Sequence, residues 1–102
     1  MDEIKLKNTL QEYHLFKGVF DSLFKRLLAN WDRLELNWIR NEITILSRLF
    51  AESKKCLEGI DIETTLEQKK LINLGTLKKK WEKQFRHPWE KFLEKWRPKL
   101  FR

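Results

Sequence analysis

The chain has few of the residues that build turns, cross-links or membrane spans. Its 102 residues include three glycines, two prolines and one cysteine. So few helix breakers suit long helices with few turns, and a lone cysteine excludes an intrachain disulfide. No stretch approaches the 18 or so uninterrupted apolar residues of a membrane span, and the acidic N-terminus lacks the pattern of a signal peptide. We therefore expect a cytoplasmic, all-α protein.

The constellations that carry catalysis are also missing from the sequence. His14, His87 and Cys56 are isolated from one another, which argues against a structural zinc site. Cys56 follows two lysines near an expected helix end, where a half-buried, inert thiol is the common outcome. The sequence contains no glycine-rich phosphate loop, nucleophile elbow or zinc-protease motif. We predict no enzyme activity, no metal and no cofactor.

What the sequence does contain is apolar residues at helical spacing. From Leu6 to Trp38, and again from Ile39 to Leu57, they recur every three or four residues. This spacing is typical of amphipathic helices and not of strands. A chain of this length forms one domain, so the pattern predicts a single-domain helical bundle of about four or five helices.

Capping residues suggest where the first two helices end. The first helix is expected to reach about Ala29, and Asn30 could cap the second. A capping box of Asp32 with Glu35 is the alternative start of that second helix. Gly59 is expected to end it, because glycine is common just after a helix C-terminus.

The last third of the chain carries similar signals. Thr65 with Gln68 has the spacing of a capping box, and the apolar phase then continues across Gly75. A proline disfavours the α conformation in the residue before it. We therefore expect a further helix to begin at Pro88 and to end at Pro98.

Charge is unevenly distributed along the chain. Residues 76–102 hold ten Lys or Arg and three Glu, a net charge of +7, which equals the net charge of the whole protein. Residues 1–75 therefore sum to zero. We interpret 1–102 as one helical domain with a neutral body at 1–75 and basic, aromatic-rich helices at 76–102. Such an asymmetry predicts attraction to polyanions, nucleic acid first.

On a helical wheel the cations of this segment oppose its apolar residues. Lys79, Lys83 and Arg86 fall on the side opposite Trp81 and Phe85. Cations three or four residues apart lie roughly 5 to 6 Å from one another, close to the spacing of successive phosphates. The candidate nucleic-acid-binding residues are Lys78, Lys79, Lys80, Lys83, Arg86, Lys91, Lys95, Arg97, Lys99 and Arg102.

A weaker candidate set lies in the neutral body. Arg26, Arg33 and Arg40 recur every seven residues and could form a second cationic row on one helix side. Asp32 and Glu35 lie nearby, so ordinary salt bridges are the alternative interpretation.

The tryptophans among the cations admit two roles. Trp81, Trp89 and Trp96 fall on the apolar face by phase, which favours packing in the core. Stacking on a nucleobase stays open for Trp96 and Phe101, near the C-terminus.

These features together predict a non-catalytic helical protein that grips a nucleic-acid backbone with little sequence preference, since lysine makes point-charge contacts with phosphate. In size, helical character and charge, the chain resembles the small helical subunits of CRISPR surveillance complexes. That resemblance implies a place in a larger nucleoprotein complex, beside other protein subunits and copies of itself. We expect no membrane partner and no small-molecule substrate.

Two rival functions remain open. Trp- and Phe-rich helices also suit a regulator or inhibitor that docks in the groove of a partner protein. Residues 88–102 place Trp, Phe and Leu opposite Lys, which is the pattern of a short helix lying on a membrane surface.

Overall fold

The computed structural model describes residues 1–101, which form helices joined by short turns with no strand among them. The α-helices are α1 (Glu3–Ala29), α2 (Leu36–Glu63), α3 (Leu66–Leu71), α4 (Leu74–Trp81) and α5 (His87–Leu100). The all-α prediction is confirmed. The chain divides into an N-terminal unit, Met1–Thr64, and a C-terminal unit, Thr65–Arg102. None of the helices within 1–101 has the length and apolar content to cross a membrane.

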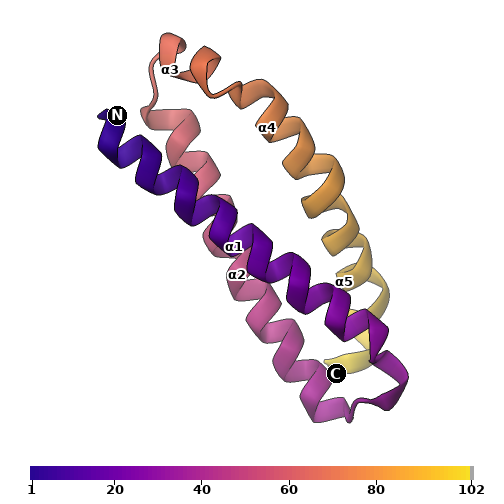
Figure 1. The fold of residues 1–102 in the computed structure, drawn as a ribbon. Coiled ribbons are helices and arrows are strands. Elements are labelled where there is room, and N and C mark those ends of the chain that lie inside the picture. Colours follow the sequence, from indigo (N-terminus) through magenta and orange to yellow (C-terminus); the bar gives the residue numbers. More distant parts are fainter. Residues whose placement is uncertain (102) are drawn as a thin grey trace. The chain divides into compact units, whose positions relative to one another are not determined.

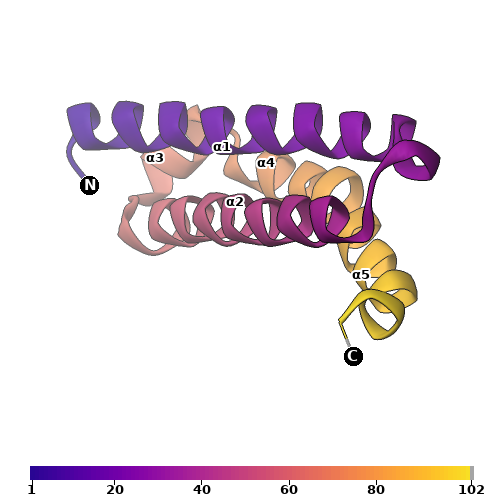
Figure 2. The same cartoon turned by 90° about the horizontal axis from the view of Figure 1, so that it is seen from below.

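The N-terminal unit is a helical hairpin in which α1 and α2 lie side by side and run in opposite directions (Figures 1 and 2). Helix α1 starts after Asp2, whose carboxylate accepts a hydrogen bond from the Lys5 N–H at 2.7 Å. It ends at Asn30, whose side-chain amide donates to the Arg26 carbonyl at 2.9 Å. No residue of α1 or α2 has a positive φ.

Two ion pairs mark the register of the hairpin. Lys5 lies 3.2 Å from Glu63 at the open end, and Arg26 lies 3.5 Å from Glu42 near the turn. Lys5 and Arg26 are 21 residues apart, and so are Glu42 and Glu63, so the two helices keep one register over three heptads. The N-terminal ammonium adds a hydrogen bond to the Glu63 carbonyl at 2.6 Å.

The core of the hairpin follows a repeat of seven residues on both helices, to which α2 adds the buried residues Ile43 and Leu57. A heptad repeat favours a left-handed supercoil, since it keeps one seam turned toward the partner helix. Across the hairpin, the ring of Phe20 in α1 lies 6.4 Å from the ring of Phe50 in α2, between centroids. The buried heptad residues are Leu6, Tyr13, Phe20 and Leu27 in α1, and Ile39, Leu46, Ser53 and Ile60 in α2.

Tyr13 sits in this core with its hydroxyl buried and without a hydrogen-bond partner. Burial, and next the negative charge of Asp21, raise the pKa of Tyr13 to about 12. The folded state therefore resists ionisation of Tyr13, and the stability from this effect is complete below about pH 10 and is lost as the pH rises toward 12.

Because Tyr13 is the single tyrosine, its ionisation can be followed by tyrosinate absorbance. We expect a midpoint near pH 12 in the folded protein, well above the usual value of about 10. The variant Tyr13→Phe should lose less stability than the wild type between pH 10 and 12, by about 2 to 3 kcal/mol at the upper end. A midpoint near 10 in the folded protein would show that the hydroxyl is hydrated.

The connection between α1 and α2 differs from the predicted capping box. Asp32 lies in a single 3₁₀ turn, Trp31–Arg33, and Glu35 is the N-cap of α2 without a side-chain cap hydrogen bond. The prediction of an Asp32–Glu35 box was therefore wrong. Leu34 is extended, which places Asp32 outside the helix that it was expected to cap.

The prediction that Gly59 ends the second helix was also wrong. Helix α2 continues to Glu63, and Gly59 does not have the positive φ that a C-terminal glycine usually supplies. The buried face continues through Ile60. The helix stops at Thr64, which is extended and whose hydroxyl donates to the Ile60 carbonyl.

The C-terminal unit opens with the capping box that the sequence predicts. The Thr65 hydroxyl accepts from the Gln68 N–H at 3.2 Å, and the Gln68 side chain accepts from the Thr65 N–H at 3.1 Å. The expected helix across Gly75 is interrupted earlier, at Asn73, which has a left-handed φ of 53°. Asparagine tolerates this conformation better than most residues, so α4 begins anew at Leu74 with Gly75 inside it.

Helices α4 and α5 are continuous through a π turn at Glu82–Arg86, so the expected break before Pro88 does not occur. The His87 N–H donates to the Glu82 carbonyl, five residues back. Proline in an α-helix would clash with the carbonyl four residues earlier, and the wider π turn accommodates it. Pro98 does not end α5 either; the helix runs to Leu100, because only the last turn loses a hydrogen bond.

Candidate nucleic-acid interface

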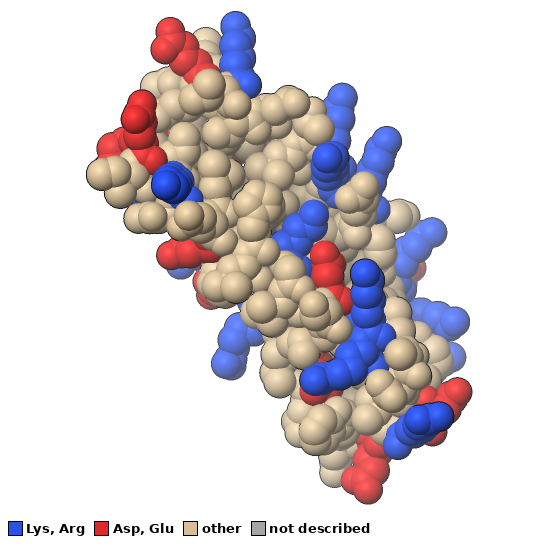
Figure 3. Space-filling model, in the orientation of Figure 1, with Lys and Arg blue, Asp and Glu red and all other residues tan. Residues whose placement is uncertain are grey.

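The division into two units makes the charge asymmetry slightly larger. Residues 65–102 hold twelve Lys or Arg and four Glu, a net charge of +8, while residues 1–64 hold ten against eleven Asp or Glu, a net charge of −1. Along α4 and α5, Lys and Arg side chains project outward and outnumber Asp and Glu in the face shown (Figure 3). The candidate interface is therefore a property of the C-terminal unit.

The feature that organises this interface is a row of lysines spaced by four. We define the lysine row as Lys79, Lys83, Lys91, Lys95 and Lys99, with His87 at the remaining position of the same spacing. All five lysines are exposed, and none of them forms an ion pair with another residue of the described chain, 1–101. Successive members rise by about 6 Å along the helix, and the row spans about 30 Å.

Helix α4, the π turn and helix α5 form one continuous helical rod. On this rod, the row at positions 82, 86 and 90 is neutralised by internal ion pairs. Arg86 donates from Nε to Glu90 at 2.8 Å and from a terminal nitrogen to Glu82 at 2.7 Å. The hydrogen bond to Glu90, followed by the charge of Glu82, raises the pKa of Arg86 above its usual value. A phosphate would compete with two carboxylates for this guanidinium. Arg86 is therefore less available than the lysine row.

The opposite side of the rod is aromatic. Trp81, Phe85, Trp89 and Phe92 are buried. The Trp81 and Phe85 rings lie 5.8 Å apart between centroids, and Trp89 stacks on Phe92 at 5.4 Å. The π turn keeps residues spaced by four more nearly in phase than an α-helix would, so these aromatic residues share a face. For Trp81 and Trp89, the predicted burial is confirmed.

Trp96 differs from the other two tryptophans because it is only half-buried. The ammonium groups of Lys95 and Lys99 lie 5.1 and 5.0 Å from the centre of its ring, within range of a cation–π interaction. The ring thus helps to position the C-terminal end of the lysine row. Phe101 is exposed.

The remaining candidates have different surroundings. Lys78, Lys80 and Arg97 are exposed side chains of α4 and α5, and Lys91 belongs to the lysine row. Arg102 lies outside the described residues. All the described C-terminal candidates are thus brought onto one continuous helical rod.

The second predicted row does not form on one helix. Arg26 lies on α1, Arg33 in the 3₁₀ turn and Arg40 on α2, because the chain reverses between residues 30 and 35. The three arginines, although seven residues apart in the sequence, therefore do not lie on one side of a single helix. Arg26 is paired with Glu42 instead.

Groups that could support other chemistry are dispersed. Within 1–101, no cluster of three or more His, Cys, Asp or Glu has the arrangement of a metal site. Cys56 is half-buried. Burial, and next the charges of Glu12 and Glu52, raise the pKa of its thiol, so the thiolate is disfavoured at neutral pH.

Sequence reasoning identified the cations but missed how they sort into rows. The signal was present: lysines at 79, 83, 91, 95 and 99 share a spacing of four, and the interleaved series at 82, 86, 90 and 94 is mostly glutamate. The sequence pattern shows the rows only if the helix continues through Pro88.

In comparisons with known proteins, no family model, no curated protein and no solved structure matches this chain.

Proposed function

We propose that the C-terminal unit binds the phosphate backbone of a nucleic acid through the lysine row. The observation that carries the proposal is a 30 Å series of exposed lysines without carboxylate partners, next to a series in which the cation is already paired. Glu82 and Glu90 pair with Arg86, which leaves the lysines of the row without a carboxylate partner among residues 1–101.

The chemistry of the row favours binding without sequence preference. Lysine ammonium groups are compact point charges, whereas base recognition commonly uses the paired donors of arginine or an amide. Contacts to phosphate fix the position of a protein on a strand and carry no sequence information directly. The row would therefore hold many sequences with similar affinity.

Membership of a larger nucleoprotein complex is part of the same proposal. Several large apolar side chains remain exposed in the folded chain, among them Ile4, Leu15, Ile62, Leu66 and Leu71. Protein subunits, including further copies of this chain, are suitable partners for such residues. The same exposed residues favour the alternative function, a helical interaction module that binds protein and not nucleic acid.

A salt series tests the proposal. If the five lysines neutralise five phosphates, the affinity should fall about 500-fold between 50 and 200 mM salt for duplex DNA, and about 130-fold for a single strand. Fluorescence polarisation with labelled DNA and RNA of several sequences measures this. No binding at 50 mM salt, or binding that does not respond to salt, would contradict the proposal and favour the interaction module.

A further inference from the structure

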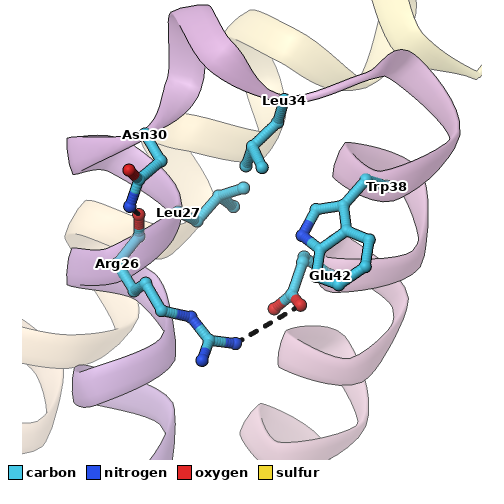
Figure 4. Close-up of a pocket in the computed structure, with 6 residues that line it drawn as sticks. All are labelled: Arg26, Leu27, Asn30, Leu34, Trp38 and Glu42. Atoms are coloured by element: carbon cyan, nitrogen blue, oxygen red, sulfur yellow. Dashed lines mark hydrogen bonds and ion pairs between the residues drawn. The ribbon is translucent and has the colours of Figure 1, made fainter.

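A small cavity lies in the N-terminal unit beside the turn of the hairpin, between the end of α1 and the start of α2 (Figure 4). Its volume is about 240 Å³. Pockets for drug-sized ligands usually hold about 300 to 1,000 Å³, so this cavity suits a single ring system. The residues around it are Arg26, Leu27, Asn30, Leu34, Trp38 and Glu42.

Glu42 gives the cavity its chemistry. Its side chain is only 10% exposed, and its carboxylate points toward the Arg26 guanidinium across the gap between the helices (Figure 4). The closest approach is 3.5 Å, longer than the 2.7 to 2.9 Å of a charge-assisted hydrogen bond. The carboxylate therefore keeps unused acceptor capacity in a sheltered place, where an unmet acceptor is costly.

Trp38 supplies a flat wall next to that carboxylate. It precedes Glu42 by four residues, so both side chains lie on the same side of α2, and the indole is 53% exposed. Exposed tryptophan is unfavourable in water and stacks well on aromatic rings. The ligand that fits is planar and offers hydrogen-bond donors at its edge.

Arg26 narrows the ligand further. The Arg26–Glu42 pair is neutral as a whole, so a cationic ligand would meet the guanidinium as a repelling neighbour. A neutral ring with two adjacent N–H donors can bind both oxygens of Glu42. Among nucleobases, guanine has this arrangement on its Watson–Crick edge, where N1–H and the 2-amino group lie side by side. The other bases would turn at least one acceptor toward the carboxylate.

We propose that this cavity binds an unpaired guanine base, stacked on Trp38 and hydrogen-bonded to Glu42. Arg26 has a 60% exposed side chain and lies where it can approach the attached phosphate. The base belongs either to free guanosine monophosphate or to a single-stranded nucleic acid. Binding of a base within a strand rests on the nucleic-acid binding proposed above. This cavity would give guanine preference to a protein whose lysine row has none.

Labelled 12-residue oligothymidylates with one central guanine, adenine or inosine test the proposal by fluorescence polarisation. We expect the guanine strand to bind about 5- to 150-fold more tightly than the adenine strand. Inosine lacks the 2-amino group and should lose most of this preference. The ratio should change little with salt, since base contacts release no counterions. Equal binding of all three strands would overturn the proposal.

Matched variants assign the preference to the cavity. Glu42→Gln keeps the size of the side chain and should abolish the preference, whereas Glu35→Gln, the same change at the N-cap of α2 outside the cavity, should keep it. Trp38→Leu should weaken guanine binding and Trp38→Phe should restore part of it. A preference that survives Glu42→Gln would refute the assignment, and circular dichroism verifies that each variant is folded.

A direct titration separates this proposal from the lysine row. Calorimetry with guanosine monophosphate and adenosine monophosphate needs no strand. Selective binding of the guanine nucleotide supports the cavity even if no oligonucleotide binds. If guanosine monophosphate does not bind but the strand preference persists and needs Glu42, the base is taken from a strand. Absence of both responses overturns the proposal and leaves the salt-dependent binding unaffected.

Discussion

Replacing Phe20 by alanine is expected to destabilise the N-terminal unit by about 3 to 5 kcal/mol. Phe20 is 1% exposed and occupies a central heptad position of α1. Its ring lies 5.6 Å from Phe24 and 6.4 Å from Phe50, between centroids. Truncation removes contacts with both helices and leaves a cavity that the hairpin cannot close. Urea unfolding followed by circular dichroism measures the loss, which for a domain of this size corresponds to a melting temperature lower by at least about 12 °C.

The neighbouring residue provides the control. Val19 is 40% exposed on the outer side of the same helix, so Val19→Ala should change the stability by no more than about 0.5 kcal/mol. A cost for Phe20→Ala close to that of Val19→Ala would contradict the heptad core, because it would show that Phe20 is not enclosed between the helices.

The helices and their apolar faces could be predicted from the sequence because they depend on local spacing. The stripe from Leu6 onward specifies which side of α1 is buried, whatever it packs against. The capping box at Thr65 and Gln68 could also be predicted, since both of its hydrogen bonds join residues three apart. Such features need no knowledge of the rest of the fold.

The helix boundaries failed where two local signals competed. Gly59 carries a stop signal, but Ile60 continues the buried face, and packing prevailed over the weak preference of one glycine. Pro88 carries a stronger stop signal, yet Trp89 and Phe92 continue the apolar face, and the π turn reconciles the two. A helical wheel drawn with 100° per residue cannot represent the π turn, because a π turn contains more residues than a turn of an α-helix.

The cavity at Glu42 could not be predicted because it depends on the register of the hairpin. Trp38 and Glu42 are neighbours on one helix, and their spacing is visible in the sequence. Arg26 reaches them only because the chain reverses between α1 and α2, and that pairing is set by the same register that joins Lys5 to Glu63. Local sequence patterns contain no information on the distance between Arg26 in α1 and Glu42 in α2.

The largest functional effect is expected from reversing two members of the lysine row. In the full chain, Lys79→Glu with Lys83→Glu removes two of five phosphate contacts and places negative charge against the strand. Each lost contact costs about tenfold at 50 mM salt, so the affinity for duplex DNA should fall at least about 100-fold. The salt slope should decrease in magnitude from about 4.5 to about 2.7.

A control variant has to show whether binding depends on the position of the lysines or only on the net charge of the protein. Lys7→Glu with Lys25→Glu makes the same change in net charge on exposed residues of α1, and it should lower the affinity far less and keep the slope. Both pairs are at the surface, so circular dichroism should show unchanged helix content. An equal loss in the two variants would mean that binding depends on the net charge of +7 alone. A loss confined to the Lys79–Lys83 variant would mean that the phosphates are bound at the lysine row and are not attracted merely by the overall charge of the protein.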